Sequence, residues 1–103
     1  MGKRQMIFKI RFSELADDQM DILEEDKSKK RILKQVNKVL GYMETNHKHP
    51  SLNTHKFDAM ESPFGGDVFE SYAQNNTPGA YRIFGAYGKN KGEITVLAIT
   101  PHP

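Results

Sequence analysis

The chain has 103 residues, 37% of them apolar and 27% charged, a composition typical of one small soluble domain with a modest core. Cysteine is absent, so disulfides and thiolate chemistry are excluded, and we expect a cytoplasmic location. No apolar run approaches the roughly 20 residues of a membrane span. No apolar signal segment opens the chain either, so we expect no membrane association.

The net charge of +2 is distributed unevenly along the chain. Residues 27–57 carry eight Lys or Arg against Glu44 alone, together with three His. Residues 1–26 carry four basic against seven acidic side chains, and residues 58–103 carry three against five. Such segregation predicts a basic face that could bind an anion, commonly nucleic acid. The alternative for residues 27–38 is a solvated helix face that happens to use lysine.

The first predicted strand covers residues 5–12, where apolar and polar side chains alternate. Lys9 and Arg11 on its outer side indicate a place near a sheet edge. Ser13 is the predicted N-cap of a helix that ends near Leu23, with acidic residues in its first turn. The inner stripe of this helix is predicted to contain Leu15, Gln19, Ile22 and Leu23.

A second helix is predicted for residues 28–45, because its apolar residues recur at three- and four-residue spacing. Lysine and arginine occupy much of the remaining surface, so we expect one buried face and one basic face. The buried stripe is predicted to contain Ile32, Leu33, Val36, Val39, Leu40 and Met43.

Residues 46–57 are polar, basic and rich in histidine, and Pro50 prevents the helix from continuing through them. We predict a loop anchored by Leu52 and Phe57. Its three histidines have no Cys, Asp or Glu among them, so a zinc site is disfavoured. A mixed Lys/His surface for phosphate groups and an ordinary polar connector both remain open.

Three further strands are predicted at residues 67–73, 81–87 and 94–99, separated by segments rich in Gly, Pro and Asn. With the preceding elements they give the order β-α-α-β-β-β. This order across residues 1–103 predicts a single α+β domain with a helical hairpin packed on a small, mainly antiparallel sheet.

The strand at residues 94–99 has apolar side chains on both faces. Strict alternation places Ile94, Val96 and Ala98 on one face and Leu97 and Ile99 on the other. A strand covered on both sides belongs in the centre of a sheet.

An arginine and a histidine on neighbouring predicted strands form the main functional clue. Arg82 lies inside residues 81–87, and the following strand leads to His102 between two prolines. Arginine suits a phosphate because its donors form a fixed fork, and histidine exchanges protons near neutral pH. Arg82 could instead pair with Glu70 on an adjacent strand, and His102 could be a frayed chain end.

The chain resembles the RelE/ParE toxin superfamily, and more specifically the RelE-type messenger RNA endoribonucleases of toxin–antitoxin pairs. The resemblance rests on His49-Pro50-Ser51-Leu52 followed by Lys56-Phe57, on Tyr81-Arg82-Ile83-Phe84, and on the last strand with its polar end. It covers almost the whole chain and includes the order of the elements, so it implies a RelE-like fold.

The resemblance implies that Arg82 contacts the scissile phosphate and that His102 transfers a proton, while basic residues after the second helix bind RNA. Cleavage without metal or cofactor needs one group that deprotonates the 2′-hydroxyl and one that protonates the leaving 5′-oxygen. His55, His49 and Tyr72 are candidates for the second proton group. The candidate catalytic residues are therefore Arg82, His102 and His55, and the candidate RNA-binding residues are Lys48, His49 and Lys56.

The implied function is that of a toxin that cleaves messenger RNA at the ribosome and is neutralised by a cognate antitoxin. An interaction module of the same fold, either ParE-type or without nuclease activity, is the alternative, and a basic RNA-binding domain without chemistry is a third. A concave surface that joins Arg82, His102 and Lys56 would favour the enzyme, whereas Arg82 locked by Glu70 would favour the module. The oligomeric state is left open.

Overall fold

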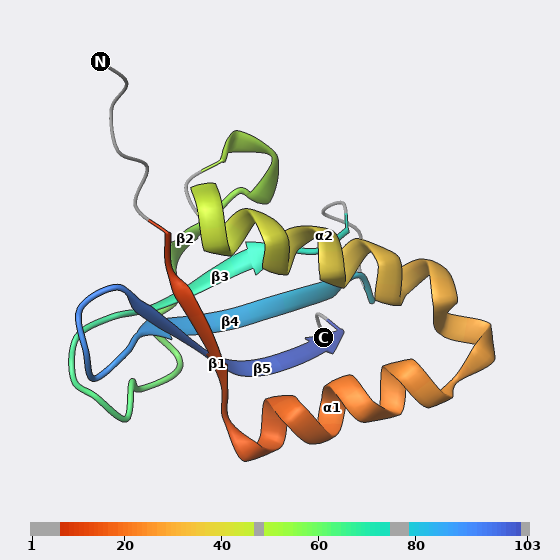
Figure 1. The fold of residues 1–103 in the computed structure, drawn as a ribbon, viewed down its shortest axis with the longest axis horizontal. Helices are drawn as coiled ribbons and strands as arrows, with labels where there is room; N and C mark the ends of the chain where they lie inside the picture. The colour runs from red at the N-terminus through yellow and green to blue at the C-terminus, as the bar shows by residue number, and fades with distance from the viewer. Residues whose placement is uncertain (1–6, 47–48, 75–78, 102–103) are drawn as a thin grey trace.

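The computed structural model describes residues 7–46, 49–74 and 79–101, which form two α-helices and a five-stranded sheet (Figure 1). The predicted α+β architecture is confirmed. The elements in chain order are β1 Lys9–Phe12, α1 Glu14–Glu25, η1 Lys27–Lys29, α2 Lys30–Asn46, η2 Pro50–Leu52, β2 His55–Lys56, β3 Val68–Tyr72, β4 Tyr81–Tyr87 and β5 Glu93–Pro101.

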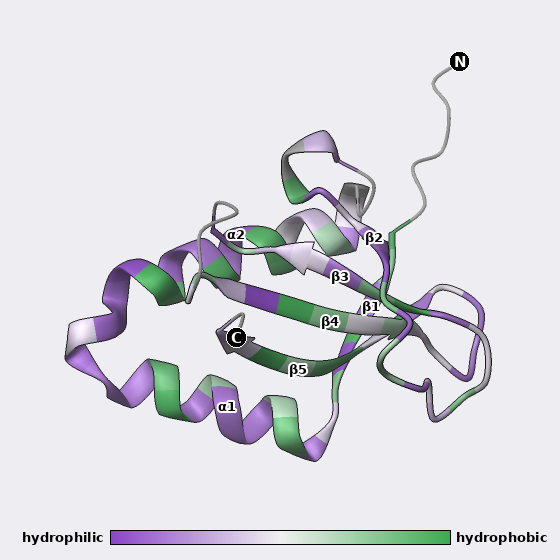
Figure 2. Cartoon of the chain, turned by 180° about the vertical axis from the view of Figure 1, so that it is seen from behind, coloured by the Kyte–Doolittle hydropathy of each residue, from purple (hydrophilic) through white to green (hydrophobic). Residues whose placement is uncertain are grey.

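The strands lie in the order β1-β5-β4-β3-β2. β1 pairs with β5 in parallel, and the other three pairings are antiparallel. β1 is therefore an edge strand and β5 an inner strand, as the sequence predicted. Helices α1 and α2 pack on one face of the sheet, which we call the helix face, and the other is called the helix-free face. In Figure 2 hydrophobic and hydrophilic bands alternate along both helices, as expected of helices with one buried side.

The main core lies between the two helices and the helix face of the sheet. Val36, Val39 and Met43 of α2 are buried there, so the predicted stripe of this helix is confirmed at its centre. A smaller cluster on the helix-free face contains no helix residue and includes Val68, Phe84, Ala86, Leu97 and Ala98.

Helix α1 begins at the predicted cap. The Ser13 hydroxyl accepts a hydrogen bond from Ala16 N at 3.1 Å and donates one to Leu97 O at 3.0 Å. At the other end, Asp26 accepts hydrogen bonds from the Ser28 hydroxyl at 2.6 Å and the Ser28 N–H at 2.9 Å. These bonds hold the pKa of Asp26 below its ordinary value, and they fix the turn between the two helices.

The predicted inner stripe of α1 was wrong at two positions. Leu15 and Ile22 are 55% and 62% exposed, whereas Ala16 and Leu23 are buried. The bonds of Ser13 to β5 explain the difference, because they rotate the first turn so that the small Ala16 faces the sheet. Gln19 does face inward, and its side-chain oxygen accepts a hydrogen bond from Ile99 N at 2.7 Å.

The predicted facing of β5 was wrong after Val96. Ala98 lies opposite Phe84 on β4, but Val96 lies opposite the next residue, Gly85, so Leu97 is an extra residue in the ladder. This β-bulge shifts the alternation by one position. Ile99 consequently joins Val96 in the main core, while Leu97 and Ala98 both belong to the cluster on the helix-free face.

The segment after α2 is more ordered than the predicted loop. Leu52 is buried, and Phe57 packs on Phe84 with ring centres 4.8 Å apart, so both predicted anchors are confirmed. His55 and Lys56 also form the short strand β2, which pairs with β3 and was missed. A two-residue strand has no periodicity that a sequence pattern could reveal.

Candidate functional site

The registers of β2, β3 and β4 bring four functional side chains to the helix-free face. His55 lies directly opposite Glu70, and Tyr72 lies directly opposite Arg82. Glu70 and Tyr72 are two residues apart on β3, so they point to the same side of the sheet. We call these four residues the Arg82 network.

Glu70 lies at the centre of the Arg82 network. One of its oxygens, Oε1, is 2.7 Å from His55 Nε2, and the other, Oε2, is 3.8 Å from Arg82 Nε. Arg82 also donates from Nη1 to the carbonyl oxygens of Ala80 at 3.1 Å and Tyr81 at 3.4 Å. The sequence left a contact between Arg82 and Glu70 open, and the structure contains it as a diagonal pair across β3 and β4.

Aromatic contacts complete the network. The Arg82 guanidinium carbon is 4.0 Å from the centre of the Tyr72 ring, within the range of a cation–π interaction. The His55 ring meets the same tyrosine edge-on, with ring centres 5.6 Å apart. Tyr72 therefore contacts both Arg82 and His55.

Burial separates the members of the network. The side chains of Arg82 and Glu70 are 1% and 5% exposed, whereas that of His55 is 45% exposed. Taking two charges out of water is costly unless they are paired, so the opposite charges of Arg82 and Glu70 explain how both are tolerated there. His55 is exposed and Tyr72 is half-buried, so these two members connect the network to solvent.

Each ring nitrogen of His55 lies within hydrogen-bond distance of an oxygen. Nδ1 is 2.7 Å from Asn53 O, and a carbonyl oxygen can only accept, so Nδ1 carries hydrogen. In a neutral ring Nε2 would then be an acceptor facing the Glu70 carboxylate, also an acceptor. A hydrogen bond between Nε2 and Glu70 Oε1, which are 2.7 Å apart, needs a proton on one of these two atoms.

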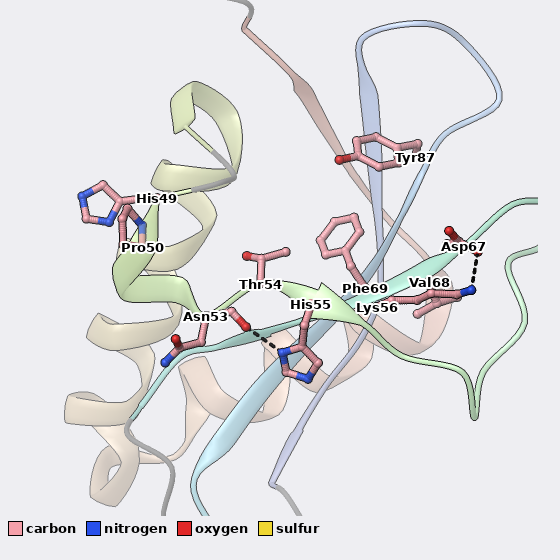
Figure 3. A pocket seen from close by; sticks show the side chains of 10 residues that line it. All are labelled: His49, Pro50, Asn53, Thr54, His55, Lys56, Asp67, Val68, Phe69 and Tyr87. Atoms are coloured by element: carbon pink, nitrogen blue, oxygen red, sulfur yellow. Dashed lines mark hydrogen bonds and ion pairs between the residues drawn. The ribbon is translucent and has the colours of Figure 1, made fainter.

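A pocket of about 580 Å³ lies on the opposite side of β2. Figure 3 shows Phe69 and Tyr87 of the sheet on one side of it and the segment that contains His49 and Pro50 on the other, with the His49 ring directed away from the pocket. We call it the β2 pocket. It is lined by His49, Pro50, Asn53, Thr54, His55, Lys56, Asp67, Val68, Phe69 and Tyr87.

The candidate residues predicted from the sequence are divided between these two places. Arg82 and His55 belong to the network, whereas His49 and Lys56 line the β2 pocket. Lys48 and His102 lie outside the described residues, so their roles stay predictions. A concave surface that joined Arg82, His102 and Lys56 would have favoured the enzyme, but Lys56 lines the β2 pocket and Arg82 does not.

Both predicted RNA-binding residues that the structure describes have protein contacts. Lys56 Nζ lies 3.5 Å from a carboxylate oxygen of Asp67 and 3.5 Å from one of Asp58, and these charges raise its pKa. The His49 ring stacks on Tyr42, with ring centres 4.4 Å apart. Lys56 is exposed and its ion pairs are of a kind that contributes little energy, so a phosphate could replace them.

Sequence reasoning missed the role of Glu70 as the partner of His55, and it missed the β2 pocket. Both depend on the pairing of β2 with β3, for which the sequence has no local signal. Within the described residues there is no group of three His, Asp or Glu side chains that could hold a metal ion. No helix in the described part of the chain is long and apolar enough to cross a membrane.

Several solved structures have the same fold as this chain. The YoeB/ParE toxin from Agrobacterium tumefaciens superimposes with a TM-score of 0.67 at 8% identity, over 93% of this chain and 100% of that one. The RelE–RelB complex from Pyrococcus horikoshii OT3 contains a chain that superimposes with a TM-score of 0.62 at 11% identity, over 93% of this chain and 96% of that one. A chain of the YoeB dimer from Staphylococcus aureus superimposes with a TM-score of 0.60 at 15% identity, over 93% of this chain and 98% of that one. No protein-family model and no curated protein sequence matches the chain.

Proposed function

We propose that this chain, which has the fold of the YoeB/ParE and RelE toxin structures, is the toxin of a type II toxin–antitoxin pair. We propose further that it is a metal-independent endoribonuclease that cleaves messenger RNA at the ribosome. The observation that supports the chemistry is the Arg82 network, because it combines a guanidinium, an imidazole in contact with a carboxylate, and an aromatic ring within one cluster.

Each member of the network has chemistry that RNA cleavage requires. Attack of a 2′-hydroxyl on the adjacent phosphorus breaks the bond to the 5′-oxygen and leaves a cyclic phosphate and a 5′-hydroxyl. The hydroxyl proton must go to a base, and the leaving oxygen must receive a proton from an acid. The imidazole of His55, 2.7 Å from Glu70 Oε1, suits one of these transfers, and Arg82 suits the charge that develops on the phosphate.

Arg82 would have to become accessible before it could contact a phosphate. Its contact with Glu70 is 3.8 Å long, and an RNA phosphate is a stronger, bidentate partner for a guanidinium. The proposal therefore includes a shift of Tyr72, which lies over the guanidinium, when RNA binds. His102 is retained as the candidate for the second proton transfer.

A second function, an interaction module of the same fold without nuclease activity, is favoured by the burial of Arg82. With its side chain 1% exposed and its charge balanced by Glu70, Arg82 would serve the stability of the sheet. In this case growth arrest would arise from binding to a cellular target.

An antitoxin protein is the proposed partner of the chain, and the cytoplasm its proposed location. The solved relatives include a RelE–RelB complex and a YoeB–YefM toxin–antitoxin complex, which supports this assignment. β1 is an edge strand of the sheet, so a segment of the antitoxin could add to the sheet there.

The test combines growth after induced expression with mapping of transcript ends in a translating extract. His55→Gln is the first variant, because the exposed His55 side chain can be changed with little effect on packing. Lys89→Gln, in the exposed turn between β4 and β5, is the control. We expect the parent and the control to arrest growth and cut transcripts, and His55→Gln to lose at least about 100-fold in cleavage rate.

The outcomes separate the two functions. Growth arrest without transcript cleavage would favour the interaction module. Cleavage that survives His55→Gln would remove His55 from the mechanism, and absence of arrest with a folded parent would overturn the toxin assignment. His102→Ala, tested in the same assay, decides whether the histidine near the chain end transfers the second proton.

A further inference from the structure

We propose that the β2 pocket binds a nucleobase, the base of a ribonucleotide next to the one whose phosphate meets the Arg82 network. The inference rests on the proposed ribonuclease function for its biological substrate. Base binding itself can be measured without any cleavage. The pocket, of about 580 Å³, has the size of a small-ligand site.

The floor of the pocket is aromatic and held in position. Phe69 and Tyr87 lie with ring centres 5.6 Å apart, and Tyr87 also contacts Phe8 at 6.0 Å. The Phe69 ring lies directly over Gly85, where a Cβ atom would be 2.8 Å from Phe69 Cζ. Glycine at this position therefore creates the space in which the Phe69 ring rests. Tyr87 is 46% exposed and presents an aromatic surface on which a flat ligand could stack.

The rim of the pocket supplies hydrogen-bonding groups. Thr54, just before β2, points into the pocket, and its hydroxyl is 2.7 Å from that of Ser71 (Figure 3). Asn53 and His49 border the pocket, but their side chains are directed away from it, and the His49 ring stacks on Tyr42. Asn53 has a φ of 47°, a left-handed conformation that asparagine adopts more readily than most residues. A hydroxyl such as that of Thr54 can pair with the edge of a base.

The charges of the pocket favour a base over a bare phosphate. Its one lysine, Lys56, lies 3.5 Å from carboxylate oxygens of Asp58 and Asp67, so a phosphate would have to displace these carboxylates, whereas a base would not. The lining therefore presents little net positive charge beside its aromatic floor. A neutral, flat ring with polar edges fits this combination, because stacking on aromatic side chains requires no charge.

His55 connects the pocket to the Arg82 network. It lines the pocket, yet its ring points to the side of β2 opposite Thr54, where it contacts Glu70 (Figure 3). A base in the pocket would thus place its nucleotide across β2, with its sugar-phosphate chain directed toward the helix-free face. This arrangement would make the pocket a determinant of the RNA sequence that is cut.

The experiment titrates the protein with AMP, GMP, CMP and UMP, and with ribose 5-phosphate as a probe that has the phosphate and lacks the base. Binding is followed by amide chemical shifts. We expect shifts at Asn53, Thr54 and Tyr87 with at least one nucleotide and none there with ribose 5-phosphate. An RNA trinucleotide, tested in parallel, should bind more tightly than the free nucleotide if the site serves RNA.

Variants of Tyr87 test the stacking. Tyr87→Leu should weaken nucleotide binding by about tenfold or more, and Tyr87→Phe should bind like the parent. Phe64→Leu is the matched control, because Phe64 is 43% exposed and lies outside the pocket. Thermal unfolding of each variant verifies that it is folded.

Three results would overturn the inference. They are equal shifts with ribose 5-phosphate, an unaffected affinity in Tyr87→Leu, and no binding of any nucleotide or trinucleotide. Transcript cleavage without base binding would leave the proposed ribonuclease intact and remove the pocket from it. Base binding without transcript cleavage would leave the pocket as a base-binding site and overturn the proposed ribonuclease.

Discussion

The two sides of β2 and β3 form a contrast between a buried, charged site and an open one. On the helix-free face, Glu70 and Arg82 are buried and oppositely charged, and they form the centre of the Arg82 network. On the other side, Phe69 forms the floor of the β2 pocket, and exposed Tyr87 lies beside it. Neighbouring residues of one strand thus serve two unlike environments, because successive side chains point to opposite faces.

The contrast shows that the richest group of functional side chains need not be the most accessible one. The Arg82 network contains described residues expected for catalysis, but its central charges are buried and lie 3.8 Å apart without a hydrogen bond between Glu70 Oε2 and Arg82 Nε. The β2 pocket offers less chemistry, and it has the volume and the exposed ring that a ligand needs. The first two predictions below test the two sides of this contrast, and the third tests an ion pair at the opposite edge of the sheet. They run from the largest expected effect to the smallest.

The largest effect is expected from Arg82→Ala, which would leave the Glu70 carboxylate buried without its charge partner. Removing one member of a buried ion pair costs about 3–5 kcal/mol of unfolding free energy. Urea unfolding measures it. Arg11→Ala is the matched control, because Arg11 pairs with Glu93 at 2.8 Å but its side chain is 53% exposed, and exposed pairs contribute about 0–1 kcal/mol.

A double variant, Glu70→Leu with Arg82→Met, isolates the charge effect. Since it removes both charges and keeps apolar volume, it should be more stable than Arg82→Ala alone. If Arg82→Ala cost no more than Arg11→Ala, the buried pair would have no structural role.

An intermediate effect is expected from Gly85→Ala on the pocket side. The new Cβ would lie 2.8 Å from Phe69 Cζ, so the ring must move, and such overpacking costs about 1–3 kcal/mol. The displaced ring should also weaken nucleotide binding. Gly41→Ala is the control with the opposite sign, because that site in α2 is open and alanine favours a helix by about 0.5–1 kcal/mol. Unchanged stability in Gly85→Ala would show that the floor of the pocket is not tightly packed.

The smallest effect concerns the exposed pair at the edge of the sheet. The hydrogen bond from Arg11 holds the pKa of Glu93 below its ordinary value of 4.5. A carboxylate whose pKa is lowered by folding stabilises the protein above its unfolded pKa, and this contribution is lost as the pH falls through the folded value. On acidification, the stability of Glu93→Gln should therefore fall less than that of the parent. The urea midpoints of both proteins between about pH 3 and 6 measure the difference.

Glu61→Gln, in the loop after β2, is the control for this measurement. High salt should reduce the difference between the parent and Glu93→Gln, because salt screens exposed pairs. A difference that persisted in high salt would show that the pair is less exposed than the structure indicates.

The candidate site was only partly predictable from the sequence. Arg82 and His55 could be chosen because their chemistry suits phosphate and proton transfer, and the contact of Arg82 with Glu70 was foreseen as an alternative. The contact of His55 with Glu70 was not, because it depends on the two-residue strand β2. The burial of Arg82 could not be predicted from the sequence either, because burial depends on all the residues that surround a side chain in the folded protein.

What the sequence determined by itself was the local structure and its order. The apolar spacing of α2, the cap at Ser13 and the β-rich segments of β3, β4 and β5 act within a few residues, so they can be read along the chain. Tertiary structure decided the rotation of α1, the bulge at Leu97 and the pairing of β2. Each of these follows from contacts between residues far apart in sequence, whose free energies become favourable only after the sheet has formed. The Arg82 network and the β2 pocket depend on such contacts, and so does any function proposed for them.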